Sequence, residues 1–502
     1  MSIIPVDDEY LRFLLGNKLQ NESQKYSHYN YRDAVHKMSE FLKKKSKGSV
    51  GVVYGLRRTG KTVALYHIAA KYIKAGWNVA YATFNYNQHD FNAVLRAIHK
   101  LTDEGYELIL LDEISRCYGF LNSAMELSDR VNGKVIIAGT DSMMVRWAMN
   151  DALFGRTCVA DTTNMSFGEY KRIFPGKSIE NFVRDGGVLW DFEPESVEQY
   201  LRTSVIENIK NSVSFLESDQ HVIDRRIFSV LDSETLYRLL VAVCELNTEA
   251  AVLKNLENRW EEPIAWKLTQ AHTDVNGLIN DEGLQKVKNG LLEYFVAFPR
   301  EEFDKNTMTV LIQRLLELRF LTEATEHSYD MVFDVLVISQ PFIRRDFVRR
   351  ILSVVAQEKI DSFTYTMDKL ESTCDGYVLE DICYMEARKR YFDKHAVQSN
   401  VFKFRGSGSE EIDVCIYRAE LKKLSLIEVK YSDKIVKQGV DSLIGQDRWL
   451  VDENVVGFLK QKYSPAELTK TVLYRGQTEE PSEAGTVRWV NVEDWLLGKV
   501  EV

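Results

Sequence analysis

The sequence predicts an α/β chain in three parts: a parallel sheet that binds phosphate, a helical middle, and a second α/β unit with acidic strands. A glycine-rich turn joins a buried strand to a helix at 49–76, helical patterns fill 178–355, and two alternating apolar strands with acidic positions occupy 409–434. A chain of 502 residues has room for roughly three domains of about 150 residues. We expect domain boundaries that give 1–177, 178–355 and 356–502.

The composition is that of a folded, water-soluble chain. Hydrophobic residues make up 45% of it and charged residues 27%, which is enough apolar surface for packed cores. No stretch approaches the roughly 18 apolar residues of a membrane helix, and the first residues lack the basic start of a secretory signal. We therefore expect a cytoplasmic protein with no membrane partner. The six cysteines are scattered without a CxxC pair, which argues against a disulfide framework or a zinc site.

The net charge limits how the chain can meet nucleic acid. A formal charge of −10 at pH 7 argues against a protein that coats nucleic acid with its whole surface. Three short basic segments remain, at 43–47, 343–350 and 386–395. Each is either a solvated helix face or part of a local groove, and charge runs are common on helix surfaces. The solvated face is the favoured interpretation for any one of them.

A phosphate-binding loop is predicted at "YGLRRTGKT". It follows the β-branched run "SVGVVYG" and precedes the helix-forming "KTVALYHIAAKYIKAG", the context that a G-x-x-x-x-G-K-[ST] loop requires. The two glycines let the backbone amides face the phosphates, while the lysine reaches the β and γ phosphates and the threonine offers a hydroxyl to Mg²⁺. The residues that we expect to contact ATP here are Gly55, Arg57, Arg58, Thr59, Gly60, Lys61 and Thr62.

A second predicted strand ends in acids. In "YELILLDEISR", at 106–116, four apolar residues precede Asp112 and Glu113, as in a Walker B strand. Asp112 is expected to hold Mg²⁺ through a water molecule, and Glu113 to orient or deprotonate the attacking water. A buried strand with an acidic end is the alternative interpretation, and it is weak beside a complete phosphate loop.

A third strand, "GKVIIAGTDS" at 133–142, places Thr140, Asp141 and Ser142 at the same carboxyl edge, where ligands bind in open α/β sheets. Thr140 is added to the expected ATP contacts. With a further strand at 77–87, the spacing allows an additional strand between the phosphate-loop strand and the acidic strand. That order, together with the adjacent glutamate, resembles the additional-strand branch of P-loop ATPases, which includes AAA+ and STAND proteins. Kinases and GTPases fit less well.

The middle of the chain shows no catalytic spacing. Helical patterns dominate it, and 306–341 predicts a helix, a turn and a β-rich hairpin, which resembles a winged-helix unit. Such a unit either places a helix in a DNA groove or relays nucleotide state between its neighbours, and relay is favoured. Trp260 and Trp266 form either an exposed stacking surface for bases or, the favoured interpretation, part of the core.

The second informative stretch is "SEEIDVCIYRAELKKLSLIEVKYSDK". Asp413 lies in its first strand, and Glu428 and Lys430 share a face of its second strand because residues two apart in a strand point the same way. Two carboxylates for a divalent metal ion and a lysine to position water match the PD-(D/E)xK nuclease arrangement. Upstream, on an amphipathic helix at 375–392, Glu380 lies where nucleases of this kind often carry a further acidic residue, which makes it a candidate metal ligand. Downstream, the candidates to complete the site are Gln438 and Gln446.

Several motifs together carry a wider resemblance. The strings "GLRRTGKT", "LLDEISR", "IIAGTDS", "LFGRT", "MSFGEYKRIF" and "FVRDGGVLW" resemble the STAND-related archaeal and bacterial ATPase family that joins an AAA-like P-loop domain to a winged helix and a C-terminal restriction-endonuclease-like domain. The likeness covers most of the chain and is strongest at its two ends. It implies that Arg156 is a mobile arginine aimed at the γ phosphate, in cis or from a neighbouring subunit. A structural arginine that packs the last strand is an equal alternative.

Two functions follow as expectations. The first is an ATPase whose nucleotide state controls a magnesium-dependent nuclease acting on nucleic acid, with DNA favoured over RNA. The second is a STAND-type switch in which ATP drives assembly, as in a homo-oligomer, and the C-terminal domain binds nucleic acid or a protein partner without cutting. A processive helicase finds less support because no helicase motif series follows the acidic strand.

Overall fold

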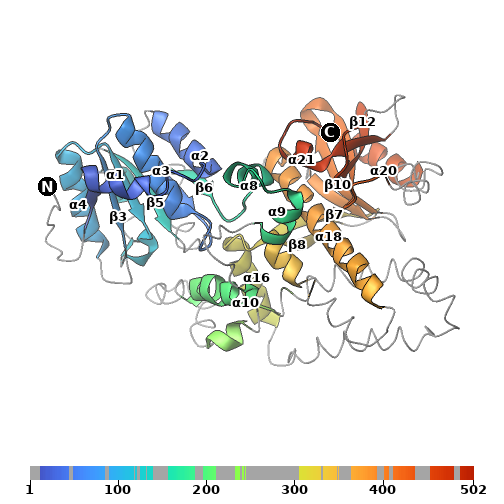
Figure 1. Ribbon diagram of the computed structural model, residues 1–502, viewed down its shortest axis with the longest axis horizontal. Coiled ribbons are helices and arrows are strands. Elements are labelled where there is room, and N and C mark those ends of the chain that lie inside the picture. The colour runs from blue at the N-terminus through green and yellow to red at the C-terminus, as the bar shows by residue number, and fades with distance from the viewer. Residues whose placement is uncertain are drawn as a thin grey trace.

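A computed structural model shows two β-sheets with helical segments between and below them (Figure 1). The structure describes residues 12–44, 49–84, 90–117, 119–120, 125–129, 131, 133–139, 157–186, 196–210, 232–237, 240–241, 244, 305–329, 332–347, 349, 363–392, 401–405, 411–435, 453–479 and 487–502. Within these residues, no helix combines the length and the apolar character needed to cross a membrane.

The N-terminal sheet has the strand order β1-β3-β4-β5-β2-β6. All neighbours pair in parallel except β1 and β3, which are antiparallel. The strands are β1 (Leu14–Leu15), β2 (Val50–Tyr54), β3 (Val79–Thr83), β4 (Leu108–Asp112), β5 (Lys134–Gly139) and β6 (Thr157–Asp161). Because β5 lies between the phosphate-loop strand β2 and the acidic strand β4, the prediction of an additional strand is confirmed.

Helices cover both faces of this sheet, which explains why β2 and β4 are buried along their whole length. One face packs against α1 (Gly16–Gln24), α2 (Asp33–Lys43) and α3 (Lys61–Lys74). The other packs against α4 (Phe91–Asp103), whose Phe91, Val94 and Ile98 are fully buried. The parallel α/β architecture places the carboxyl ends of β2 and β4 together at one edge.

The middle region forms a helical core that also includes the base of a hairpin. Its elements are α10 (Val197–Tyr200), the π-helical η3 (Leu201–Ile206), α16 (Lys305–Glu317), β7 (Leu321–His327) and β8 (Val332–Ile338). The predicted helix, turn and hairpin are therefore present in that order. Whether they make a winged helix stays a prediction.

The C-terminal sheet has the order β13-β12-β11-β10-β9-β7-β8. Strands β9, β10 and β11 pair antiparallel, and β11, β12 and β13 pair in parallel. Their bounds are β9 (Val401–Arg405), β10 (Glu411–Arg418), β11 (Lys423–Val429), β12 (Glu467–Tyr474) and β13 (Arg488–Asn491). The two acidic strands that the sequence predicted are the neighbours β10 and β11.

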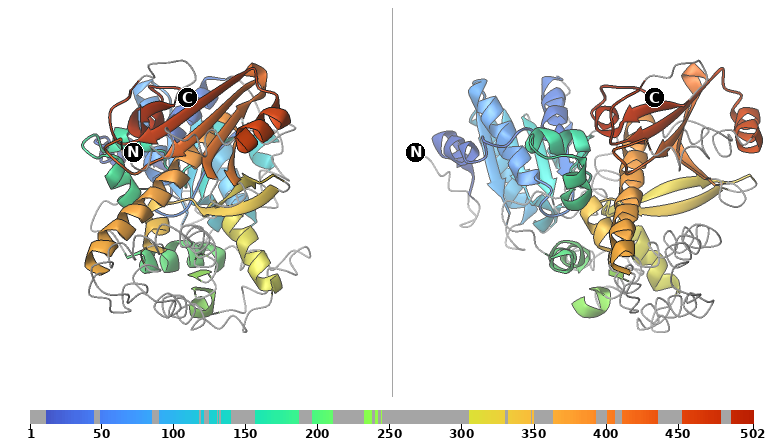
Figure 2. Two further views of the ribbon diagram at one scale, coloured as in Figure 1. Left: turned by 90° about the vertical axis from the view of Figure 1, so that its right-hand side faces the viewer. Right: turned by 45° about the vertical axis from the view of Figure 1, so that its right-hand side comes forward.

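Two segments join this sheet from outside the expected C-terminal part. The hairpin extends it through parallel pairing of β7 with β9 at Glu326 and Lys403. Helices α8 (Phe167–Ile173) and α9 (Ile179–Asp185) pack into its core beside α18 (Phe363–Tyr391) and α21 (Val492–Leu496). Both views in Figure 2 show the long helix α18 extending away from the sheet. The middle and C-terminal parts thus share a continuous sheet.

Candidate functional site

The phosphate loop runs from the end of β2 to the start of α3, as predicted. Gly60 begins α3 with a left-handed φ of 83°, a conformation that favours glycine. Gly55 is required by space, since a Cβ there would lie 2.4 Å from Oγ1 of Thr162 and 2.9 Å from the backbone nitrogen of Thr163. The backbone angle thus accounts for Gly60, and the lack of space for a side chain accounts for Gly55.

Lys61 is folded onto its own loop. Its Nζ donates to the carbonyl oxygens of Gly55 and Leu56, each at 2.8 Å, and its side chain is buried. The ammonium group therefore already lies inside the curl of the loop. Turning it from these carbonyls to the β and γ phosphates exchanges neutral acceptors for charged ones, which make stronger hydrogen bonds.

Asp112 is the buried carboxylate at the end of β4. Its Oδ2 accepts hydrogen bonds from Oγ1 of Thr62 at 2.7 Å and from the hydroxyl of Tyr81 at 3.1 Å. Burial and the neighbouring Glu113 raise the pKa of Asp112, while Thr62, Lys61 and Tyr81 oppose the rise. A hydroxyl beside a carboxylate is the oxygen-donor set that Mg²⁺ takes, so these two residues fit the metal ion that accompanies ATP.

Glu113 departs from the strand directly after Asp112. Its φ is 55°, a left-handed conformation that is uncommon for residues other than glycine and recurs at functional sites. Its backbone nitrogen donates to Oδ1 of Asp112 at 3.1 Å. The chain therefore leaves the strand in a tight turn at Glu113, directly after the carboxylate of Asp112.

The phosphate loop also enters the helical core of the middle region. Leu56 is fully buried there among residues such as Leu240 and Leu315. Next to it, the guanidinium of Arg57 donates to the carbonyl oxygen of Thr203 at 3.0 Å, and the hydroxyl of Tyr200 donates to the carbonyl oxygen of Arg57 at 3.3 Å. The arginine that was expected to contact ATP is thus engaged with the middle region. Arg58 is exposed, with a φ of 60°.

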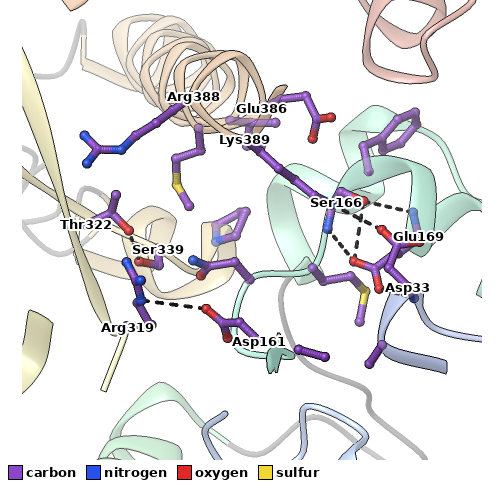
Figure 3. A pocket seen from close by; sticks show the side chains of 18 of the residues that line it. Asp33, Asp161, Ser166, Glu169, Arg319, Thr322, Ser339, Glu386, Arg388 and Lys389 are labelled. Carbon is purple, nitrogen blue, oxygen red and sulfur yellow. Dashed lines mark hydrogen bonds and ion pairs between the residues drawn. The ribbon is translucent and has the colours of Figure 1, made fainter. Parts of the chain in front are cut away.

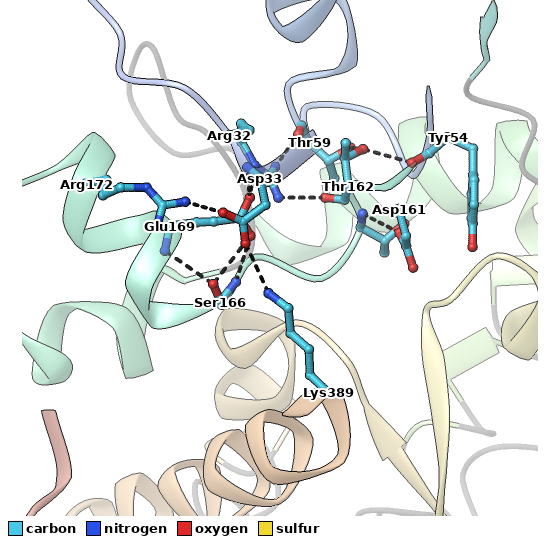
Figure 4. Close-up of polar contacts among 11 residues, drawn as sticks. Arg32, Asp33, Tyr54, Thr59, Asp161, Thr162, Ser166, Glu169, Arg172 and Lys389 are labelled. Carbon is cyan, nitrogen blue, oxygen red and sulfur yellow. Dashed lines mark hydrogen bonds and ion pairs between the residues drawn. The ribbon is translucent and has the colours of Figure 1, made fainter. Parts of the chain in front are cut away.

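A buried arginine supports the loop from behind. Arg32, which is 2% exposed, precedes α2 and donates from Nε to Oε1 of Glu169 at 3.0 Å. Its other nitrogens donate to the carbonyl oxygens of Thr59 and of Thr162 (Figure 4). Sequence reasoning missed this residue because it lies outside the loop motif, and no local pattern connects it with Glu169.

Several predicted site residues lie outside the described residues. They are Thr140, Asp141 and Ser142 after β5, Arg156 before β6, Gln438 and Gln446 after β11, and the tryptophans Trp260 and Trp266. Their expected roles stay predictions.

In the C-terminal sheet, Asp413 and Glu428 lie on adjacent strands. Val414 pairs with Ile427 in the antiparallel register, so Asp413 and Glu428, the next residue on each strand, lie opposite each other. Oδ2 of Asp413 accepts a hydrogen bond from the backbone nitrogen of Val429 at 2.7 Å. Lys430, two residues after Glu428, forms an ion pair with it. The predicted trio is therefore brought together.

Glu380 of α18 lies near the same group. Burial opposes a charged Lys430, but Glu428, Asp413 and Glu380 outweigh this effect and raise the pKa of the lysine. Burial also raises the pKa of Cys383, with smaller contributions from Asp413 and Glu380. Within the described part of the chain, however, no three His, Cys, Asp or Glu side chains are gathered in a way that could hold a metal ion. The donor atoms suit Mg²⁺, but their present positions do not form a metal site.

The basic segments of the sequence are largely engaged in internal contacts. Arg344 pairs with Asp381 at 3.1 Å and Arg345 with Asp375 at 2.7 Å, which fastens the helix after β8 to α18. In the next segment, Arg390 donates to the carbonyl oxygens of Trp495 and Leu496. These residues therefore hold elements together, and the interpretation as freely solvated helix faces was wrong for the three arginines. The segment at 43–47 is described only in part.

Comparison with known proteins identifies one domain. Residues 47–171 match the model of an AAA domain, a segment that contains the phosphate loop, Asp112 and Glu113. No curated protein matches the chain. The chain therefore carries an AAA-type P-loop domain, which supports ATP binding and hydrolysis.

Similar solved structures are distant. Caenorhabditis elegans PCH-2 is 13% identical, with 46% of this chain and 67% of that chain covered and a TM-score of 0.24. A katanin structure described for its self-assembly is 14% identical, with 45% and 77% covered and a TM-score of 0.20. A DNA replication initiation factor is 14% identical, with 70% and 97% covered and a TM-score of 0.18. Scores this low carry no argument about function, so the AAA-type assignment rests on the domain model and on the strand order.

Proposed function

We propose that the chain is an ATPase whose nucleotide state controls a metal-dependent, nuclease-like C-terminal unit acting on nucleic acid, with DNA as the expected substrate. The main support is a continuous series of packing contacts from the phosphate loop to the C-terminal sheet. Leu56 of the phosphate loop packs into the helical core of the middle region, and the hairpin built on that core extends the sheet that bears Asp413 and Glu428. A change at the loop therefore has a packed route to the acidic strands.

The ATPase part of the proposal uses residues of the AAA-type domain. Lys61 would leave the carbonyls of its own loop to bind the phosphates, and Thr62 and Asp112 would hold Mg²⁺. The bound metal ion would neutralise phosphate charge during transfer. Glu113, whose left-handed backbone ends the acidic strand, would orient the attacking water.

The nuclease part rests on the three acids and the lysine of the C-terminal unit. Asp413 and Glu428, with Glu380 as a third carboxylate, would hold the divalent ion that supplies charge neutralisation at the scissile phosphate. Lys430 stays charged because the carboxylates raise its pKa. For a metal ion to bind, Glu428 would have to release its ion pair with Lys430, which offers a point of control.

A second function, the non-cleaving switch, is favoured by two observations. Asp413 and Glu428 already have internal partners in Val429 and Lys430. In addition, Arg344 and Arg345 are engaged with acids of α18. In this alternative, ATP would drive assembly, and the C-terminal unit would recognise nucleic acid or a partner without turnover. The helix and hairpin of the middle region would serve as a relay in either case.

A cleavage assay separates the two functions. Purified protein is incubated with plasmid, linear and single-stranded DNA and with RNA, in Mg²⁺ or Mn²⁺, with and without ATP. Glu428→Ala is the test variant, and Glu420→Ala, an exposed acid on the turn between β10 and β11, is the matched control. Cleavage that is lost only in Glu428→Ala supports the nuclease. If every substrate stays intact while ATP is hydrolysed, the nuclease is refuted and the switch is supported.

The same preparation tests the ATPase itself. Lys61→Ala should lose ATP binding, measured by equilibrium titration with a fluorescent ATP analogue. The molecular mass of the wild type in solution, with and without ATP, tests the expected homo-oligomer. Wild-type ATP affinity in the Lys61→Ala variant would refute the assignment of the phosphate loop.

A further inference from the structure

The back of the phosphate loop is held by side chains from outside its motif. Oγ1 of Thr59 lies 2.8 Å from Oγ1 of Thr162, and the latter donates to the carbonyl oxygen of Tyr54 at 2.9 Å. The backbone nitrogen of Leu56 donates to Oγ1 of Thr163 at 3.2 Å. The segment after β6 thus supports the loop where it leaves β2 and where it approaches Lys61.

Arg32 joins this support to α8. Its guanidinium spans the carbonyl oxygens of Thr59 and Thr162 on one side and the carboxylate of Glu169 on the other. Both ionic partners are almost fully buried, with 2% and 4% of their side chains exposed. A buried charge is costly unless it is paired and hydrogen-bonded, so the arginine constrains all three partners at once.

Glu169 in turn organises the start of α8. It accepts hydrogen bonds from the backbone nitrogens of Asp33 at 2.8 Å and of Ser166 at 3.2 Å, and it completes a capping box with Ser166. Burial raises the pKa of Glu169, but Arg32 and the backbone donor of Asp33 outweigh it and lower the pKa overall. The carboxylate is therefore ionised at neutral pH, as the pair with Arg32 requires.

A last link reaches the C-terminal unit. Asp33 forms an ion pair with Lys389 of α18 at 3.2 Å, and with Arg172 of α8. These residues lie beside a cavity of about 410 Å³ whose lining includes Asp33, Glu169 and Lys389 (Figure 3). Because the cavity lies between α2 and α18, apolar side chains do not fill the space there, and the ion pair of Asp33 with Lys389 connects the two helices across it.

We propose that Arg32 is a positioning residue of the ATP site: it sets the shape of the phosphate loop through Thr59 and makes that shape depend on α8 and α18 through Glu169, Asp33 and Lys389. ATP binding would then alter the contacts of α18 by the same route. This inference rests on the proposed use of ATP at the loop.

The first experiment separates positioning from general stability. Arg32→Lys keeps the charge but cannot span three acceptors with a planar fork. We expect its Kd for the fluorescent ATP analogue to rise at least tenfold, with hydrolysis of bound ATP in single turnover changed less than threefold. Lys43→Gln, on α2 and ion-paired with Glu40 at the surface, is the control and should bind as wild type. The Kd is measured at a temperature at which Arg32→Lys is folded. If this variant has a lower melting temperature but a wild-type Kd, Arg32 has a merely structural role and the proposal is overturned.

The second experiment tests the link without touching the buried pair. Lys389→Ala changes a side chain that is 50% exposed, so the fold should persist. Hydrogen exchange of α8 and α18 is followed with and without ATP in the wild type, Lys389→Ala and Arg32→Lys. We expect an ATP-dependent change in α18 of the wild type that is at least halved in Lys389→Ala. An undiminished change in that variant would refute the link.

The proposed function and this inference fail differently. Loss of ATP binding in Lys61→Ala confirms the site, and wild-type behaviour of Arg32→Lys would then refute only the inference. If Lys61→Ala binds ATP as the wild type does, the site assignment itself is wrong.

Discussion

Leu56 offers a direct test of the contact between the phosphate loop and the middle region. Leu56 lies within the segment that matches the AAA domain. Its side chain, however, is fully buried in the helical core of the middle region, with Leu311, Leu315 and Phe320. Replacing a buried leucine by alanine typically costs about 2–5 kcal/mol, because transfer free energy is lost and a cavity remains. Since Leu56 has no exposed surface, we expect Leu56→Ala to fall within this range.

The location of the effect matters more than its size. At 1.4 kcal/mol per tenfold, a loss of about 2 kcal/mol raises the population of the opened state roughly 30-fold. Some amides of α16 exchange only when the helical core opens. At these amides, hydrogen exchange should therefore be faster by at least roughly 30-fold. Exchange is the suitable assay because a chain of several units does not unfold in one two-state transition.

Leu65→Ala is the matched control. Leu65 is equally buried, on α3, but it packs under the N-terminal sheet with Val53 and Ile136. Its replacement should accelerate exchange in β2 and β5 and leave α16 unchanged. If Leu56→Ala accelerates exchange only in the N-terminal sheet, or by less than about threefold in α16, the loop does not hold the middle region and the reasoning fails.

Three further predictions concern single side chains. Glu113→Gln should bind ATP with wild-type Kd and hydrolyse it at least tenfold more slowly, because the amide cannot take a proton from water; a wild-type rate in a phosphate-release assay would contradict the role of Glu113. Tyr81→Phe removes a donor to buried Asp112 and should lower the free energy of opening at β3 and β4 by about 1–3 kcal/mol, measured by hydrogen exchange of their amides; unchanged exchange would contradict it. Burial and Lys462 lower the pKa of His327 to about 4 from its usual 6.5, so the wild type should lose up to about 3 kcal/mol of stability as pH falls from 6.5 to 4. His327→Phe should flatten that dependence in melting curves, and an unchanged pH profile would argue against a neutral buried His327.

The layout of the candidate ATP site could be predicted in large part because its signals are local. Gly55, Gly60, Lys61 and Thr62 lie within one turn, and a buried apolar run identifies the strand that carries Asp112. The spacing of the motifs left room for the additional strand, since parallel strands need long crossover connections. Asp413, Glu428 and Lys430 came together for a related reason, because side-chain alternation and a short turn determine which residues share a face.

The contacts of the loop with the rest of the chain could not be predicted in this way. Arg32 and Glu169 lie 137 positions apart, and Leu56 resembles any apolar loop residue in sequence. The arginines at 344 and 345 were also misjudged, because their partners Asp381 and Asp375 lie on a different helix. Pairing between distant segments depends on packing, which short patterns do not encode.

By itself, the sequence determined the local chemistry of this protein: a phosphate loop before a helix, a carboxylate at the end of a buried strand, and an acid and Glu-x-Lys on paired strands. These depend on backbone geometry and side-chain alternation over a few residues. Only the tertiary structure decided that Leu56 enters the core of the middle region, that the hairpin extends the C-terminal sheet, and that Arg32 connects the loop with α8. These depend on burial of surfaces and charges from segments far apart in the chain, where the cost of an unpaired buried charge selects the partner.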